Sequence, residues 1–246
     1  LLTAADIGMS NGWMILTAPQ SDWAETSVVA AQIADRESRD GGQPIRVFRG
    51  SSRDWRPKAW SLRSSAERHR EGFRWDRQTL YPKYHLENGL AMVEAYGGTA
   101  SYDYLAVLGA ARRYGLRRPD GVAEPEPAVM NVLGVRYLVL PADFEYPTAK
   151  LLPPNASQSH VPNVALWRNP QSFPRAWIVH EAVTVPPLRG AGPDQVARRT
   201  RQVFFPGDEP LDFRRTAVVE SGVKPVLFAV PPPAGSLDEE SCQIVL

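Results

Sequence analysis

Cysteine is nearly missing from this chain, since Cys242 is the only one among its 246 residues. A single thiol excludes an intrachain disulfide, and with it the stapled scaffolds that small secreted proteins use in place of a large core. Long apolar runs are missing too, because none approaches the roughly 18 residues of a membrane-spanning helix. The chain must therefore be held together by an ordinary hydrophobic core, which its 43% apolar content can supply.

The sequence also lacks an excess of one charge sign, because 28 Lys and Arg residues stand against 27 Asp and Glu residues. Nucleic acids and anionic membrane surfaces are bound by concentrated basic faces, so we expect no nucleic-acid partner. Two local arginine clusters occur, at Arg112–Arg118 and Arg198–Arg201. For both, the prediction is a solvated helix face or a helix C-terminus.

Motifs for catalysis and for cofactors are absent as well. The sequence contains no HExxH, no paired cysteines, no EF-hand loop, no G-x-S-x-G turn and no glycine-rich phosphate loop. Its histidines are too far apart in the sequence for a local metal motif, at His69, His85, His160 and His180. We therefore expect no metal and no cofactor, and a zinc site assembled from distant residues is the alternative.

The sequence does contain one unit whose limits are clearly marked by proline and glycine, PAVMNVLGVRYLVLP at residues 127–141. Pro127 suits the first turn of a helix, Gly134 suits the left-handed residue that ends one, and Pro141 removes a ladder donor and stops a strand. Both faces of residues 135–140 are largely apolar, which is typical of an interior strand. The unit predicts a short helix that leads into a buried strand.

Further elements are predicted around this unit. Helices are expected at 21–39, with Ser21 as N-cap, at 99–114, and from Pro193 onward. Strands are expected at 44–49, 164–168, 175–185, 215–220 and 225–230. Residues 50–98 are expected to be irregular, and residues 143–162 are expected to form a loop. The fold class is therefore α/β or α+β, with one mixed sheet of about six strands covered by helices and an aromatic-rich irregular insertion. Residues 1–246 are expected to form a single soluble domain, and a boundary near 124–127 is the alternative.

The aromatic-rich insertion holds the candidate binding site. Its residues combine Trp and Tyr rings, which can stack on sugars, with charged groups: Trp75, Asp76, Arg77, Lys83, Tyr84 and His85. Asp76 with Glu87 or Glu71 could form a carboxylate pair for glycoside chemistry, although that mechanism depends on a separation in space. Salt bridges around a packed aromatic cluster are the structural alternative. No residue is assigned a catalytic role from the sequence.

Three segments, in this order, resemble the soluble part of YfhO-type bacterial multi-pass membrane proteins, which are related to lipid-carrier-dependent, GT-C-type glycosyltransferases. They are VMNVLGVRYLVLP at 129–141, VALWRNPQSFPRAWIVHEAV at 164–183 and LDFRRTAVVE at 211–220. A fourth family pattern is matched by Leu80, Pro82, Tyr84, Gly89 and Tyr96. Lys83 departs from that pattern, where the family often has Asn.

The resemblance implies a non-catalytic extracytoplasmic domain, on the periplasmic face of the cell membrane, in an integral membrane protein that transfers lipid-linked sugars to cell-surface glycans. Its partners would be the membrane-spanning part of the same polypeptide and an acceptor glycan or lipid-linked sugar. The chain begins without Met, so we expect it to be a piece of a longer polypeptide. Whether the parent protein is a membrane glycosyltransferase stays open. The alternatives are a stand-alone carbohydrate enzyme using Asp76 and a structural or protein-interaction module.

Overall fold

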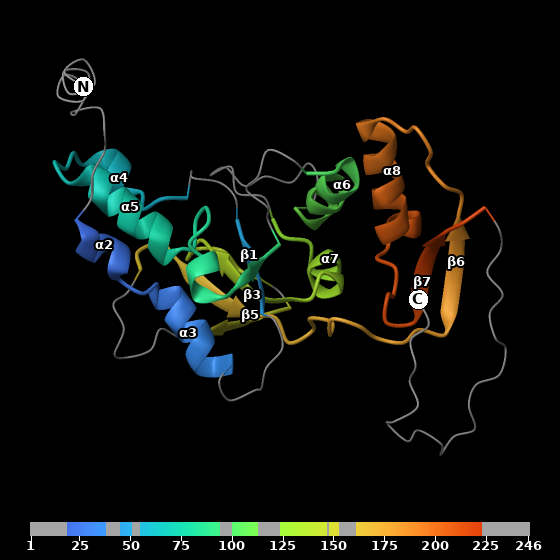
Figure 1. The fold of residues 1–246 in the computed structure, drawn as a ribbon, viewed down its shortest axis with the longest axis horizontal. Coiled ribbons are helices and arrows are strands. Elements are labelled where there is room, and N and C mark those ends of the chain that lie inside the picture. The colour runs from blue at the N-terminus through green and yellow to red at the C-terminus, as the bar shows by residue number, and fades with distance from the viewer. Residues whose placement is uncertain are drawn as a thin grey trace, which may run out of the picture.

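The computed structural model describes residues 19–37, 45–50, 55–93, 100–112, 124–146, 148–152 and 161–222. A five-stranded mixed sheet lies at the centre of these residues with helices on both of its sides, and a two-stranded sheet lies at one end (Figure 1). The α/β class expected from the sequence is therefore confirmed. The predicted strand at 225–230 and the lone Cys242 lie outside the described residues.

The helices are α2 (Gln20–Ala24), α3 (Val28–Glu37), α4 (Ala59–Leu62), α5 (Arg68–Gln78), α6 (Tyr102–Ala111), α7 (Pro127–Val132) and α8 (Pro193–Phe204), with 3-10 turns η2 (Leu86–Asn88) and η3 (Pro206–Asp208). The strands are β1 (Arg46–Arg49), β2 (Ala91–Met92), β3 (Val135–Leu140), β4 (Lys150–Leu152), β5 (Ala165–Arg168), β6 (Glu181–Val185) and β7 (Thr216–Glu220). Among the described residues, no helix combines the length and the apolar character that crossing a bilayer requires.

The unit predicted at residues 127–141 forms as expected and holds the centre of the fold. Pro127 opens α7, Gly134 takes φ +64°, and β3 follows at once. In the central sheet the strand order is β2-β1-β3-β5-β4, so β3 is the middle strand. It pairs in parallel with β1 and antiparallel with β5. Both of its edges are thereby hydrogen-bonded, which explains its apolar composition.

Side chains on β3 alternate between two hydrophobic cores. Leu138 and Leu140 join the core that contains residues of α6, α7 and α8. Tyr137 and Val139 join the core on the opposite face, with residues of α3 and α5. Because neighbouring strand residues point to opposite faces, one strand can serve both cores, and the fold has helices on each side of the sheet (Figure 1).

The second sheet is a parallel pair, with β6 and β7 in register from Glu181 opposite Thr216 to Val185 opposite Glu220. Helix α8 connects these two strands in the sequence and packs against α6, so it stands between the central region and the small sheet (Figure 1). The prediction of one sheet of about six strands is therefore wrong. The reason is that β4, which lies inside the segment predicted as a loop, pairs with the edge of β5 that is left free by β3. The central sheet therefore ends at β4.

Four further predictions are corrected. The single helix at 21–39 is two helices, because Ser27 is buried, accepts from the Ala30 amide at 3.2 Å and donates to the Gln78 carbonyl at 2.9 Å. Ser21 lies inside α2, whose N-cap is Pro19. The region at 50–98 is not irregular throughout, since it contains the 11-residue helix α5. The strand predicted at 175–185 begins only at Glu181. One domain against two stays a prediction.

Candidate functional site

Trp75, the first predicted binding residue, lies in the core rather than on the surface. Its side chain belongs to α5 and is only 3% exposed. The ring meets Trp55 edge-on at 5.0 Å and Trp60 at 6.3 Å between centroids, and its indole nitrogen donates to the Pro162 carbonyl at 3.0 Å. These contacts make Trp75 a packing residue that joins α5 to two distant segments.

The neighbouring charged residues form ion pairs. Asp76 meets Arg56 with 2.7 Å between Oδ2 and Nη2, and its other carboxylate oxygen is buried without a hydrogen-bond partner among the described residues. Arg77 is buried, donates to the Glu25 carbonyl at 2.6 Å, and reaches Glu87 at 3.0 Å. Asp76 and Glu87, the proposed carboxylate pair, are therefore each paired with a different arginine. Glu71, the other candidate partner, pairs with Arg68 at 2.7 Å.

The remaining predicted residues lie around the turn between α5 and η2. Tyr84 packs edge-on against Phe73 at 5.8 Å, and Arg77 lies 5.4 Å from its ring centroid. Burial raises the pKa of Tyr84 and lowers the pKa of His85. The Nδ1 atom of His85 is buried without a partner in the described part of the chain, whereas Lys83 is exposed. Ligand binding by this segment stays a prediction.

A second candidate site lies between α8 and the β6–β7 sheet. Here a hollow of about 350 Å³, called the apolar groove below, is bounded by side chains that are mostly aliphatic. Its apolar walls come from both strands, from α8 and from the segment after it, through Val183, Val185, Val203, Leu211 and Val218. The parallel pairing of β6 with β7 brings these residues together, although they span more than 30 positions in the sequence.

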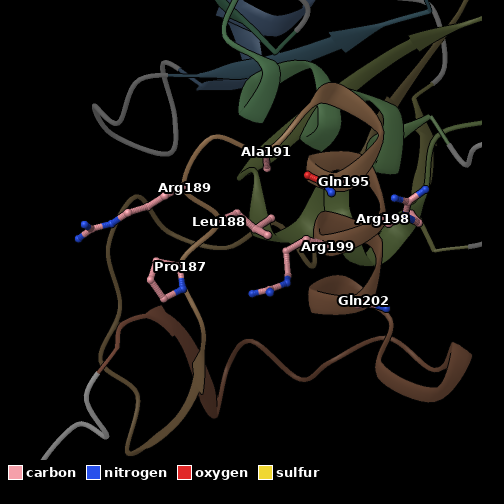
Figure 2. Close-up of a pocket in the computed structure, with 8 residues that line it drawn as sticks. All are labelled: Pro187, Leu188, Arg189, Ala191, Gln195, Arg198, Arg199 and Gln202. Carbon is pink, nitrogen blue, oxygen red and sulfur yellow. The ribbon is translucent and has the colours of Figure 1, made fainter.

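An arginine-lined hollow of about 280 Å³, called the arginine pocket below, adjoins the apolar groove. Figure 2 shows Arg199 extending from α8 toward Leu188 and Pro187, with Arg189 on the loop that precedes the helix. Arg198 and the amide residues Gln195 and Gln202 complete the lining. Arg199 and Gln202 line both hollows, so the arginine pocket and the apolar groove are neighbours that meet at these two side chains.

The lining of the arginine pocket carries only positive charge, and one carboxylate, that of Glu220, lies beside the pocket and accepts from the Leu188 backbone amide. None of the residues that line either hollow is acidic, and within the described residues neither Arg189 nor Arg198 has a carboxylate partner. Arg199 donates one guanidinium hydrogen bond to the Pro186 carbonyl at 2.9 Å, which holds the side chain across the junction. An exposed cationic hollow of this kind can accept an anion, because arginine presents several donors in one plane.

Sequence reasoning missed this site. It assigned the cluster Arg198–Arg201 to a solvated helix face, and that holds for Arg201, which is exposed and lies 3.8 Å from Asp208. It does not hold for Arg199, which is half-buried and faces two hollows. The available signal was the run of small and bend-forming residues PPLRGAG immediately before the helix, which places a cation on the loop that leads into α8.

Within the described ranges, no three His, Cys, Asp or Glu side chains are grouped closely enough to hold a metal ion. Comparisons of the chain with protein-family models, with curated proteins and with solved structures gave no match.

Proposed function

We propose that this chain is an extracytoplasmic, non-catalytic domain of a YfhO-type multi-pass membrane protein that takes part in moving sugars from a lipid carrier to cell-surface glycans. The domain would brace the membrane part of the same polypeptide and bind a ligand of the reaction. The observation that carries this proposal is that the second segment of the resemblance contacts both the first and the third, although the segments are separate in the sequence.

The first and second segments meet at Asn169, whose side chain is 1% exposed. Its amide nitrogen donates to the Asn131 side chain at 2.8 Å and to the Val135 carbonyl at 3.0 Å. The side-chain oxygen of Asn169 accepts from the backbone amide of Gln171 at 3.1 Å. The backbone amide of Phe173 donates to the Asn131 carbonyl at 2.8 Å. The asparagine of the NP pattern thus fastens the second segment to the turn before β3.

The third segment closes on the second. Trp177 donates its indole hydrogen to the Phe213 carbonyl at 2.7 Å. Arg214 lies 4.4 Å from the ring centroid of Phe173 and donates to the Gln171 carbonyl at 3.2 Å. Phe173 and Trp177 pack edge-on, with 4.9 Å between their centroids. These contacts define a junction, made from all three segments, that joins the central sheet to the β6–β7 sheet.

The junction supports the proposal because a matching pattern that arises by chance has no reason to converge in space. The residues that form the contacts belong to the quoted segments, including Asn131, Asn169 and Arg214. The stand-alone enzyme is the weaker alternative, since Asp76, its central residue, is held by Arg56 at 2.7 Å.

The proposal is tested by labelling intact cells that produce the full-length parent polypeptide without other cysteines. Leu62→Cys places a thiol where the native side chain is 82% exposed, and Ile33→Cys, at a fully buried position, is the matched control. A maleimide that does not cross membranes should label the Leu62→Cys protein in intact cells, and the Ile33→Cys protein only after denaturation. Labelling of Leu62→Cys only after lysis would overturn the extracytoplasmic assignment.

A further inference from the structure

We propose that the arginine pocket and the apolar groove together bind one amphiphile, a lipid that carries a phosphate group. Its phosphate would lie at Arg199 and its hydrocarbon chain would run along the valines of the groove. The inference deepens the proposed function, on which it rests for the biological identity of the lipid, since a lipid carrier of sugars has this chemistry. The physical argument itself rests on the two hollows alone.

The phosphate end is defined by Arg199 and its neighbours. One guanidinium donor of Arg199 is fixed on the Pro186 carbonyl at 2.9 Å, which leaves other donors of the same plane for a ligand. Arg189 and Arg198 also line this hollow and add positive charge at its margins, where Figure 2 shows their side chains directed away from Arg199. Phosphate oxygens accept paired hydrogen bonds from a guanidinium, so a phosphate matches the donors present.

The hydrocarbon end is defined by the walls of the apolar groove. Val183 is 49% exposed although it is a β-branched apolar side chain, and Val218 and Val203 stand beside it on the neighbouring strand and on α8. Covering such side chains with a methylene chain is favourable by about 25 cal/mol per Å² of apolar surface removed from water. The volume of the groove, 350 Å³, falls at the lower end of the roughly 300–1,000 Å³ that small-molecule sites occupy.

The combination favours an amphiphile over two simpler ligands. A free phosphate would use the arginines and leave the apolar groove uncovered. A neutral glycan would be expected to stack on aromatic rings, and none of the residues that line the apolar groove is aromatic. The joined lining, with Arg199 and Gln202 common to both hollows, fits one ligand that is charged at one end and apolar along its length.

The experiment is a calorimetric titration of the 246-residue chain with octyl phosphate, kept below the concentration at which it forms micelles. Inorganic phosphate supplies the head without the chain, and octyl glucoside supplies the chain with a neutral head. We expect saturable binding of octyl phosphate and at least tenfold weaker binding of the other two probes. Equal binding of octyl glucoside, or of inorganic phosphate, would overturn the proposal, and so would no binding of octyl phosphate.

Two variants of α8 locate the phosphate. Arg199→Gln should weaken octyl phosphate binding at least tenfold, because it removes a charge-assisted hydrogen bond to the phosphate. Arg201→Gln is the matched control, since it removes the same charge from the same helix but lines neither hollow, and it should leave the affinity within about twofold. Equal effects of the two variants would indicate general charge attraction and overturn the site.

A third variant locates the chain. Val218→Ser, on the exposed small sheet, should weaken octyl phosphate binding severalfold and leave the response to inorganic phosphate unchanged. No loss of affinity in this variant would contradict the placement of the hydrocarbon chain. Circular dichroism of each variant checks that it is folded. The titration and the cysteine labelling can fail separately, because a domain on either side of the membrane could bind the amphiphile.

Discussion

Replacing Asn169 with Ala should loosen the junction between the two sheets. The side chain makes three hydrogen bonds, to the Asn131 side chain at 2.8 Å, the Val135 carbonyl at 3.0 Å and the Gln171 amide at 3.1 Å. Each such bond contributes about 1 kcal/mol, so the three together contribute about 3 kcal/mol. Because the site is buried, water replaces the lost partners poorly, and the buried Val135 carbonyl loses a donor.

The cost is measured by urea unfolding followed by tryptophan fluorescence at neutral pH. Asn88→Ala is the matched control, because Asn88 makes one side-chain hydrogen bond, to the Tyr84 carbonyl at 2.9 Å, and should cost about 1 kcal/mol. The expected order is a clearly larger loss for Asn169→Ala. If the two variants lose the same free energy of unfolding, Asn169 does not fasten the junction and the reasoning is refuted.

Two further predictions use the same unfolding assay. Gly134→Ala should lower the free energy of unfolding by about 1 kcal/mol more than Gly89→Ala does. Both glycines have φ +64°, but only at Gly134 would the new Cβ lie 3.1 Å from a backbone oxygen, that of Phe173. Equal costs would show that the oxygen moves away freely. Hydrogen bonds from Arg70 and Arg74 lower the pKa of Asp22 below its ordinary 3.8, so this pairing stabilises the fold above that pH and the stabilisation is lost as the pH falls through the folded-state pKa. Asp22→Asn should therefore reduce the acid-induced loss of stability at pH values below the ordinary pKa of 3.8, and an unchanged pH profile would contradict the pairing.

The sequence predicted the structure best where residues that start or end helices and strands agree with the spacing of the apolar residues. Pro127, Gly134 and Pro141 bound a helix and a strand whose order and limits the structure reproduces. The helix expected at 99–114 forms as α6 from Tyr102, and its N-cap Ser101 accepts from the Tyr104 backbone amide. These residues act through local backbone geometry, which depends little on distant contacts.

Distant contacts explain what could not be predicted. Helix α5 has only two large apolar residues, Phe73 and Trp75, so its sequence resembles a loop. It is held instead by long-range pairs, such as Arg70 with Asp22 at 3.0 Å and Trp75 with the Pro162 carbonyl at 3.0 Å. Strand β4 has three residues and forms only because β5 offers it an edge. No local pattern contains this information.

The same limit applies to the candidate sites. Aromatic and charged residues at 75–85 attract notice in the sequence, but Trp75, Asp76 and Arg77 are occupied by core and ion-pair contacts. The groove is instead assembled from ordinary valines on β6, β7 and α8, which meet only after the two strands pair. Their function as a wall depends on the pairing and not on their individual chemistry.

Adding octyl phosphate to the isotopically labelled chain and recording amide NMR spectra tests the central claim, that ligand binding belongs to the α8 and β6–β7 region. If the ligand binds there, we expect chemical-shift changes that cluster at residues 183–203 and 216–220, around Arg199. The amide chemical shifts of Trp75 to His85 should stay unchanged. Changes centred on Trp75 to His85 would return the site to the aromatic segment. Changes scattered over both regions, or none at all, would also contradict the claim.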